Sequence, residues 1–281
     1  MLSRIYLEIT NICNRSCAFC PGTKRAPRAL TPEEFAFLAA KLRPHTDYLY
    51  LHVMGEPLAH PQLPELLKTA GELGFRVILT TNGTLLAARQ EALLSAPCLH
   101  KVHISLHSFE ANDRGGFAQY LRGCTAFGRA AMARGILINY RLWNLDGAET
   151  EGLHTRNDDI LAALHAAFPD KWDENSWGWR LAPGVFVQYG ERFEWPELSA
   201  RDRGARGRCL ALRQQAAVLC DGTVIPCCLD HEGDMALGNL FTQEWEEILS
   251  SPAACAIRGG FAAGRRAHPL CRTCGFASRF G

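Results

Sequence analysis

Directly after an apolar run at residues 5–9, the chain reads Cys13-Asn14-Arg15-Ser16-Cys17-Ala18-Phe19-Cys20. This spacing, C-x3-C-x2-C, puts three thiol groups in one short loop. Iron–sulfur clusters are held by cysteine thiolates, and a [4Fe–4S] cluster normally takes four of them. Three ligands leave one iron open, much as a catalytic zinc ion keeps an open position. The spacing therefore predicts a cluster that can bind a substrate or cofactor and pass it an electron.

This triplet, after a predicted first strand, resembles the signature of the radical SAM superfamily. The resemblance implies that Cys13, Cys17 and Cys20 hold a [4Fe–4S] cluster whose open iron chelates S-adenosylmethionine (SAM). Reductive cleavage of SAM would yield a 5′-deoxyadenosyl radical that removes a hydrogen atom from a substrate. Phe19, between two ligands, can shield the cluster from water. The alternative is a zinc site, but zinc ligands usually come as C-x2-4-C pairs.

The composition is that of a globular enzyme. Of 281 residues, 47% are hydrophobic and 21% are charged, and the net charge is +1. This length suits one large domain or one domain with a small appendage, and the low net charge argues against an extended nucleic-acid surface. The sequence has no apolar run of the roughly 20 residues that span a bilayer and no signal-peptide pattern. We therefore expect a cytoplasmic protein without membrane contact, in which clustered cysteines bind metal.

Strand and helix patterns alternate through the first two thirds of the chain, which predicts an α/β fold with a parallel sheet. A capping box at Thr31 and Glu34 marks the start of the first helix. With the resemblance, five or six βα units imply a partial (β/α)6 radical SAM barrel over residues 1–183, with its chemistry at the carboxyl ends of the strands. The strands are expected at residues 4–10, 48–54, 76–80, 101–106, 137–143 and 177–181.

Polar residues fall at the ends of these strands. Gly55-Glu56-Pro57 follows the second strand and closely matches the GEP-type motif of the family, although Gly and Pro are also common in ordinary turns. The resemblance implies that Gly55 lets the backbone approach SAM and that Glu56 accepts hydrogen bonds from its methionyl ammonium. It also implies SAM-binding roles for Asn82 and Ser105, on the third and fourth strands. For both, a turn or backbone hydrogen bond is the alternative.

Two polar residues, Asn139 and Arg141, alternate on the fifth strand and so share a face, and both are predicted to bind SAM. A guanidinium binds a carboxylate bidentately, so Arg141 is predicted to hold the SAM carboxylate, with a structural ion pair inside the barrel as the alternative. Four further side chains are predicted near strand ends, where they can face a substrate: His52, His107, Trp143 and Arg180.

Residues 184–281 form a second region with its own cysteines. It resembles the SPASM/twitch extensions of radical SAM enzymes, which implies that four thiolates complete one auxiliary [4Fe–4S] cluster without an open iron. The matching positions are the C-x12-G-x4-C pattern of Cys209, Gly222 and Cys227 and the later pair Cys271 and Cys274.

Three points of this region stay open. Cys228 adjoins Cys227 and leaves the second ligand ambiguous, although the spacing favours Cys227. The same four cysteines would also suit a structural zinc site. Since only seven residues follow Cys274, a single auxiliary cluster is expected. Asp221-Gly222 predicts a hairpin turn between two short strands.

These features predict a radical SAM oxidoreductase. The auxiliary cluster would accept the electron left on a substrate radical, giving dehydrogenation of a small molecule or modification of a peptide. A one-electron donor such as flavodoxin or ferredoxin is implied. If the auxiliary cluster is structural, a thiol donor (Cys220, Cys228 or Cys255) makes epimerisation the alternative. RNA modification is a third, less favoured candidate, suggested by arginines at 201–213 and 265–266, and the alternative of another class is a non-enzymatic iron–sulfur or zinc protein. The sequence does not identify the substrate.

Overall fold

The computed structural model describes residues 1–110 and 115–280. In that part of the chain the strands form one 11-stranded sheet in the order β11-β10-β9-β1-β2-β3-β4-β5-β8-β7-β6. The strands are β1 (Arg4–Leu7), β2 (Tyr48–Tyr50), β3 (Arg76–Thr81), β4 (Leu99–Ser105), β5 (Leu137–Leu145), β6 (Asp173–Asn175), β7 (Gly178–Ala182), β8 (Val185–Glu191), β9 (Gln215–Val218), β10 (Thr223–Ile225) and β11 (Gly238–Asn239).

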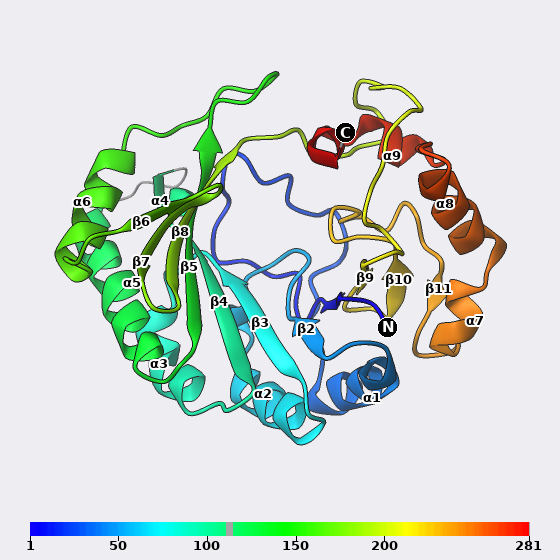
Figure 1. Cartoon of the computed structure of the whole chain (residues 1–281). Helices are drawn as coiled ribbons and strands as arrows, with labels where there is room; N and C mark the ends of the chain where they lie inside the picture. The colour runs from blue at the N-terminus through cyan, green and yellow to red at the C-terminus, as the bar shows by residue number, and fades with distance from the viewer. Residues whose placement is uncertain (111–114, 281) are drawn as a thin grey trace.

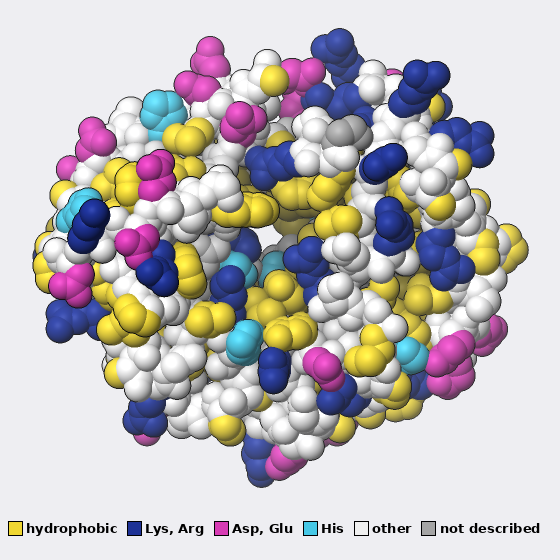
Figure 2. All heavy atoms as spheres, viewed as in Figure 1, with side chains coloured by type: hydrophobic (Ala, Val, Ile, Leu, Met, Phe, Trp, Pro, Cys, Tyr) yellow, Lys and Arg dark blue, Asp and Glu magenta, His cyan; other side chains and the backbone are white. Residues whose placement is uncertain are grey.

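The run from β9 to β8 is parallel, and the strands beyond each end of it pair antiparallel. The sheet is curved, and helices α1, α2, α3, α5 and α6 cover its outer face (Figure 1). This is the predicted α/β partial barrel. The hollow at the centre of the molecule in Figure 2 is called the lumen below. The helices are α1 (Pro32–Leu42), α2 (Leu63–Glu72), α3 (Leu86–Leu94), α4 (His107–Glu110), α5 (Phe117–Met132), α6 (Asn157–Ala167), α7 (Trp245–Leu249), α8 (Pro252–Ala262) and α9 (Pro269–Thr273).

The side chains of each strand point alternately toward the helix layer and toward the lumen. Ile5 and Leu7 of β1 are fully buried in the main core, which also contains Phe35 of α1. Tyr6 lies in a separate small cluster on the other face. The predicted capping box of α1 is present: the Thr31 hydroxyl accepts from the Glu34 backbone, and the Glu34 carboxylate accepts from the Thr31 backbone. Because successive strand side chains point to opposite faces, each strand contributes one set to each layer.

The sixth parallel strand is not the one predicted. Residues 177–181 belong largely to β7, which is antiparallel, and the strand that pairs in parallel with β5 is β8. Pro183 and Gly184 form the turn between β7 and β8, where Gly184 has φ +77°. An antiparallel pair needs only such a short turn, whereas a parallel pair needs a long crossover. The sheet thus continues past residue 183, and the division into domains 1–183 and 184–281 stays a prediction.

The second region adds to the same sheet. The predicted hairpin is confirmed, since β9 and β10 pair antiparallel around Asp221-Gly222. β9 also pairs in parallel with β1, which puts the first residues of the chain beside those after residue 214. None of the helices in the described residues has the length and apolar character that crossing a membrane requires.

Candidate functional site

The three cysteines of the triplet lie on a loop above the carboxyl end of β1. Cys13 and Cys20 are exposed and Cys17 is partly buried. The base of the loop is closed where the Asn11 side chain donates to Ala26 O (2.9 Å) and accepts from Arg28 N (2.8 Å). Surrounding protein raises the pKa of the Cys13 and Cys20 thiols by desolvation. Bound iron offsets this effect, because thiolates are the ligands that metals take.

A buried ion pair holds this loop to the barrel. Arg25 binds Glu8 through two hydrogen bonds of 2.8 and 2.7 Å, and the Glu8 side chain is fully buried. The same carboxylate accepts from Met54 N (3.0 Å), after β2, and from Cys220 N (3.1 Å), after β9. One carboxylate therefore ties the cysteine loop to both regions of the chain. The prediction from sequence missed this pair; the signal was a charged residue at an inward position of an otherwise apolar strand.

Gly55 and Glu56 bind the ends of the strands to the loop. Gly55 has φ +75°, and a Cβ there would lie 2.3 Å from Thr10 O, so only glycine fits. The buried Glu56 carboxylate accepts from Leu58 N (3.0 Å) and Asn82 N (2.7 Å), and burial raises its pKa. Each of its oxygens accepts one backbone N–H group and keeps a second lone pair, so the hydrogen bond from the SAM ammonium stays a prediction.

The predicted residue Asn82 lies beside the cysteine loop. Its side-chain nitrogen donates to Asn14 Oδ1 (2.9 Å) and lies 4.0 Å from Cys13 Sγ. Phe19 lies at the rim of the barrel, the edge formed by the carboxyl ends of the strands. Its ring centroid is 4.9 Å from that of His107, and His107 Nδ1 lies 3.0 Å from Arg141 O. The structure thus brings Cys13, Asn82 and Phe19 to the carboxyl edge of the sheet.

Arg141 and Asn139 lie at different depths. Arg141 pairs with Ser105 in the β4–β5 register, at the end of β4, whereas Asn139 pairs with His103 one layer lower. The Asn139 amide donates to His103 Nδ1 (3.0 Å) and to Gln188 Oε1 (2.9 Å). Arg141 lies over the Trp143 ring at 4.6 Å. Ser105 and Arg141 are therefore grouped at the rim, and Asn139 is inside the lumen.

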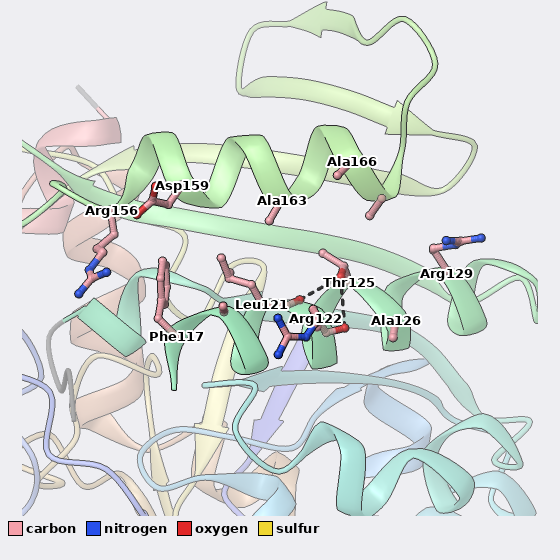
Figure 3. Close-up of a pocket in the computed structure, with 12 residues that line it drawn as sticks. Phe117, Leu121, Arg122, Thr125, Ala126, Arg129, Arg156, Asp159, Ala163 and Ala166 are labelled. Carbon is pink, nitrogen blue, oxygen red and sulfur yellow. Dashed lines mark hydrogen bonds between the residues drawn. The ribbon is translucent and has the colours of Figure 1, made fainter. Parts of the chain in front are cut away.

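Two grooves lie near these elements. A cavity of about 410 Å³ borders the cysteine loop at Phe19 and Cys20 and is closed on the far side by residues 192–201. Trp195 of that segment donates to Phe19 O (3.1 Å). A larger groove of about 810 Å³ runs between α5 and α6 on the outer layer (Figure 3), and none of the predicted site residues lines it. Of these two, the cavity at the loop is the one lined by predicted site residues, Phe19 and Cys20.

Four cysteines of the second region come together from three segments. Burial raises the pKa of Cys227 well above its usual value, and the charges of the adjacent Cys228 and of Cys209, Cys274 and Cys271 raise it further. Burial and neighbouring thiols likewise raise the pKa of Cys271 to about 12. Within residues 1–110 and 115–280, no three His, Cys, Asp or Glu side chains are placed to hold a single metal ion. The four thiols lie near enough to influence one another electrostatically.

A buried arginine accompanies these thiols. Arg266 is 8% exposed, and its Nε has no hydrogen-bond partner among the described residues. Its charge lowers the pKa of Cys209, Cys271 and Cys274, against the larger raising effect of burial. An all-thiolate cluster is anionic, and a buried cation is stable only beside an opposite charge. The donor set and the arginine therefore fit an iron–sulfur cluster.

Cys227 and its neighbour Cys228 face different surroundings. Cys228 is hydrogen-bonded to the Tyr6 side chain and packs on the small lumen cluster of Tyr6, Val53 and Ala217. Burial raises the pKa of Cys228 to about 11. The dipeptide thus joins the four-thiol group to the lumen.

Other residues singled out from the sequence lie elsewhere. Arg180 forms an exposed ion pair with Asp173 in the β6–β7 hairpin and does not join the site. Cys255 is exposed on α8. In the arginine-rich segment 201–213, Arg203 pairs with Glu149 and Glu194.

Comparisons with known proteins agree with this geometry. Residues 7–147 match the family model "Radical SAM superfamily", and residues 209–275 match "Iron-sulfur cluster-binding domain" (SPASM). GTP 3',8-cyclase of Marinobacter nauticus is 34% identical over 212 residues, which cover 71% of this chain and 57% of that protein. PqqA peptide cyclase of Rhodopseudomonas palustris is 33% identical over 121 residues, covering 41% and 32%. The chain spans between 31% and 57% of the length of the curated relatives compared.

Solved structures share the fold. The structure of anSMEcpe with bound AdoMet (SAM) has a TM-score of 0.61 at 13% identity and covers 97% of this chain and 88% of that one. BtrN in complex with AdoMet and 2-DOIA has a TM-score of 0.54 at 17% identity, covering 98% and 93%. From the matched half of the chain, the protein belongs to the radical SAM superfamily, with a [4Fe–4S] cluster and SAM as cofactors and auxiliary iron–sulfur binding in its SPASM domain.

Proposed function

We propose that this chain is a radical SAM oxidoreductase that removes a hydrogen atom from a carbon of a small molecule or peptide bound in the lumen. When bound, the loop cluster and SAM supply the electron and the carbon radical, and the auxiliary cluster supplies an electron acceptor. In this proposal Cys13, Cys17 and Cys20 hold the first cluster, and Cys209, Cys227, Cys271 and Cys274 hold the second.

The remaining residues of the site position SAM and shield the cysteine loop from water. Phe19 and Trp195 keep water from the loop, and Asn82, Ser105 and Arg141 line the SAM site at the rim. Glu56 holds the backbone of Leu58 and Asn82 and, with its remaining lone pairs, accepts from the SAM ammonium. Asn139, one layer lower, faces the substrate instead of the cofactor. A flavodoxin or ferredoxin would deliver the first electron, in the cytoplasm.

The observation that carries the oxidoreductase proposal is the Cys227-Cys228 dipeptide. Cys227 belongs to the four-thiol group, while Cys228 contacts Tyr6 in the lumen. One peptide unit therefore separates the proposed electron acceptor from the chamber in which a substrate radical would form. Short separation of this kind supports electron transfer from substrate to cluster.

Anaerobic reconstitution with iron and sulfide, followed by dithionite and SAM, tests this function. We expect about eight irons per chain and formation of 5′-deoxyadenosine without added substrate. Complete absence of SAM cleavage at full iron occupancy would favour the non-enzymatic iron–sulfur protein. About four irons plus one zinc would remove the electron acceptor.

Epimerisation is the second candidate, and the Cys228 thiol in the lumen favours it. A thiol can give a hydrogen atom to a substrate radical, after which the external one-electron donor and a proton restore the thiol. Once a substrate is found, deuterium uptake at carbon in D2O without net oxidation identifies epimerisation, and a product two hydrogens lighter identifies dehydrogenation. RNA is not supported, because Arg203 pairs with carboxylates and Arg266 is buried.

A further inference from the structure

Three cations point into the lumen from different strands. Arg4 on β1, Lys101 on β4 and Arg141 on β5 alternate with neighbours that are fully buried on the helix side, such as Ile5 and Val102. Figure 2 shows the centre of the molecule hollowed, with Lys, Arg and His side chains gathered around the opening. The interior of the barrel is therefore positively charged.

These cations lack carboxylate partners among the described residues. Burial lowers the pKa of Arg141 to about 10, and the acidic side chains that act on both Arg141 and Arg4 are Tyr6, Tyr50 and Cys228, none of which is a carboxylate. The Nε atoms of Arg4 and Arg141 are buried without a hydrogen-bond partner in the described part of the chain. Buried charges in proteins are normally paired, so the lumen has more positive than negative charge and can accept anions.

Neutral polar groups surround the cations. His103 is 6% exposed, and burial and the charges of Arg141, Lys101 and Arg4 hold its pKa well below the usual value. All three cations thus act on one side chain. Asn139, 5% exposed, contacts His103 and leaves its Oδ1 without a partner among the described residues. This arrangement can hold an anion and, beside it, an uncharged hydrogen-bond donor.

Depth separates the cations into two levels. In the β4–β5 register Arg141 pairs with Ser105, and Lys101 pairs with Leu137. Four residues of strand correspond to about 13 Å. The backbone of Arg141 is thus beside the proposed SAM site, and its guanidinium still acts on Tyr6, Tyr50 and Lys101, whereas the backbones of Lys101 and Arg4 lie near the amino ends of their strands. The SAM carboxylate can take Arg141 but leaves the lower pair uncompensated.

We infer that the lower lumen binds an anionic group of the substrate, a phosphate or a carboxylate, through Arg4 and Lys101. This inference rests on the proposed function, because it takes the lumen to be the substrate chamber. The inference predicts a substrate whose anionic group lies about 13 Å, or four strand residues, from the carbon that reacts at the rim.

Titration calorimetry of the reconstituted, unreduced holoenzyme with inorganic pyrophosphate and, separately, succinate tests the inference. We expect one site for at least one probe, with affinity at least tenfold weaker in Lys101→Gln and in Arg4→Gln. Lys101→Arg keeps the charge and should retain binding. Lys68→Gln, on the exposed face of α2, is the matched control and should bind as the wild type does.

Two outcomes would overturn the inference. One is binding of neither probe, or binding that the lumen variants leave unchanged. The other is a parallel loss of SAM affinity in Lys101→Gln with competition between probe and SAM, which would assign the cations to the SAM carboxylate. If Lys101→Gln or Arg4→Gln does not fold, titrations of Lys101→Arg and of the wild type in the presence of SAM still show whether the probe and SAM compete for the same cations. No turnover is needed, so a wild type that binds pyrophosphate but never cleaves SAM would refute the proposed function and leave the anion site standing.

Discussion

The cysteines of the loop come from eight consecutive residues, 13–20, whereas the four of the second region come from three segments between residues 209 and 274. Two of the three loop thiols are exposed, and all four of the others are partly buried. A buried arginine accompanies the second group; no arginine is among the charges that shift the pKa of Cys13 or Cys20. The loop can thus form its ligand set locally, while the second set depends on the fold.

This difference has a functional meaning. An exposed three-thiol loop leaves space for a cofactor on the open iron, and a buried four-thiol site with its own cation closes the coordination. The first arrangement suits a site that reacts and the second suits one that stores an electron. The variants below separate the two.

Cys13→Ala should have the largest effect. Loss of one of only three ligands should abolish formation of 5′-deoxyadenosine and lower iron from about eight to about four per chain. The remaining iron would belong to the second site, which does not share this loop. Cys255→Ser, at an exposed position on α8, is the control and should keep both values. Retention of SAM cleavage in Cys13→Ala would show that the loop is not the catalytic site.

Cys227→Ala and Cys228→Ala should differ from each other. Cys227→Ala should lower iron by about half and keep the loop cluster, because the loop is local. Cys228→Ala should keep the full iron content, since its thiol is hydrogen-bonded to Tyr6. Iron and sulfide analysis with electron paramagnetic resonance distinguishes the two clusters. Equal iron loss in both variants would contradict the assignment of Cys227 as the ligand.

Glu8→Gln should affect both sites, because Glu8 contacts the loop and the second region at once. It leaves the Arg25 charge buried without its partner, which costs about 3–5 kcal/mol and lowers the Tm by on the order of 10 °C. The double variant Glu8→Gln/Arg25→Gln should lose less than the sum of the single variants. Glu72→Gln, exposed on α2, should change the Tm by little. An unchanged Tm in Glu8→Gln would mean that the two regions are not coupled through this pair.

The smallest effect concerns pH. His103 has a pKa held well below its usual value by burial, so the folded protein keeps it neutral while the unfolded chain protonates near pH 6.5. Stability contributed by the neutral ring is therefore lost as pH falls below about 6.5, by about 2 kcal/mol at pH 5. His103→Gln removes this dependence, so the Tm gap between wild type and variant should shift by a few degrees between pH 7.5 and 5. A gap that is constant with pH would show that His103 is not buried as a neutral group.

Much of the fold could be predicted from the chain. The strands β1 to β5, the capping box of α1 and the hairpin at Asp221-Gly222 are local patterns, and each is present. The sixth parallel strand was missed because residues 177–181 and β8 are both short and partly apolar. Which of the two segments pairs in parallel with β5 depends on contacts between strands, and the pattern of apolar residues along one segment does not contain that information.

The sequence by itself determined the triplet of the loop, the family resemblance and the four cysteines that match the SPASM pattern, because all of these depend on spacing along the chain. Only the tertiary structure put Cys228 against Tyr6, buried Arg266 beside the thiols and joined Glu8 to Arg25 and Cys220. It also gathered Arg4, Lys101 and Arg141 from three strands into one chamber. The physical reason is that desolvation and charge pairing act through space, so a charge distant in sequence becomes a neighbour only after the strands have paired.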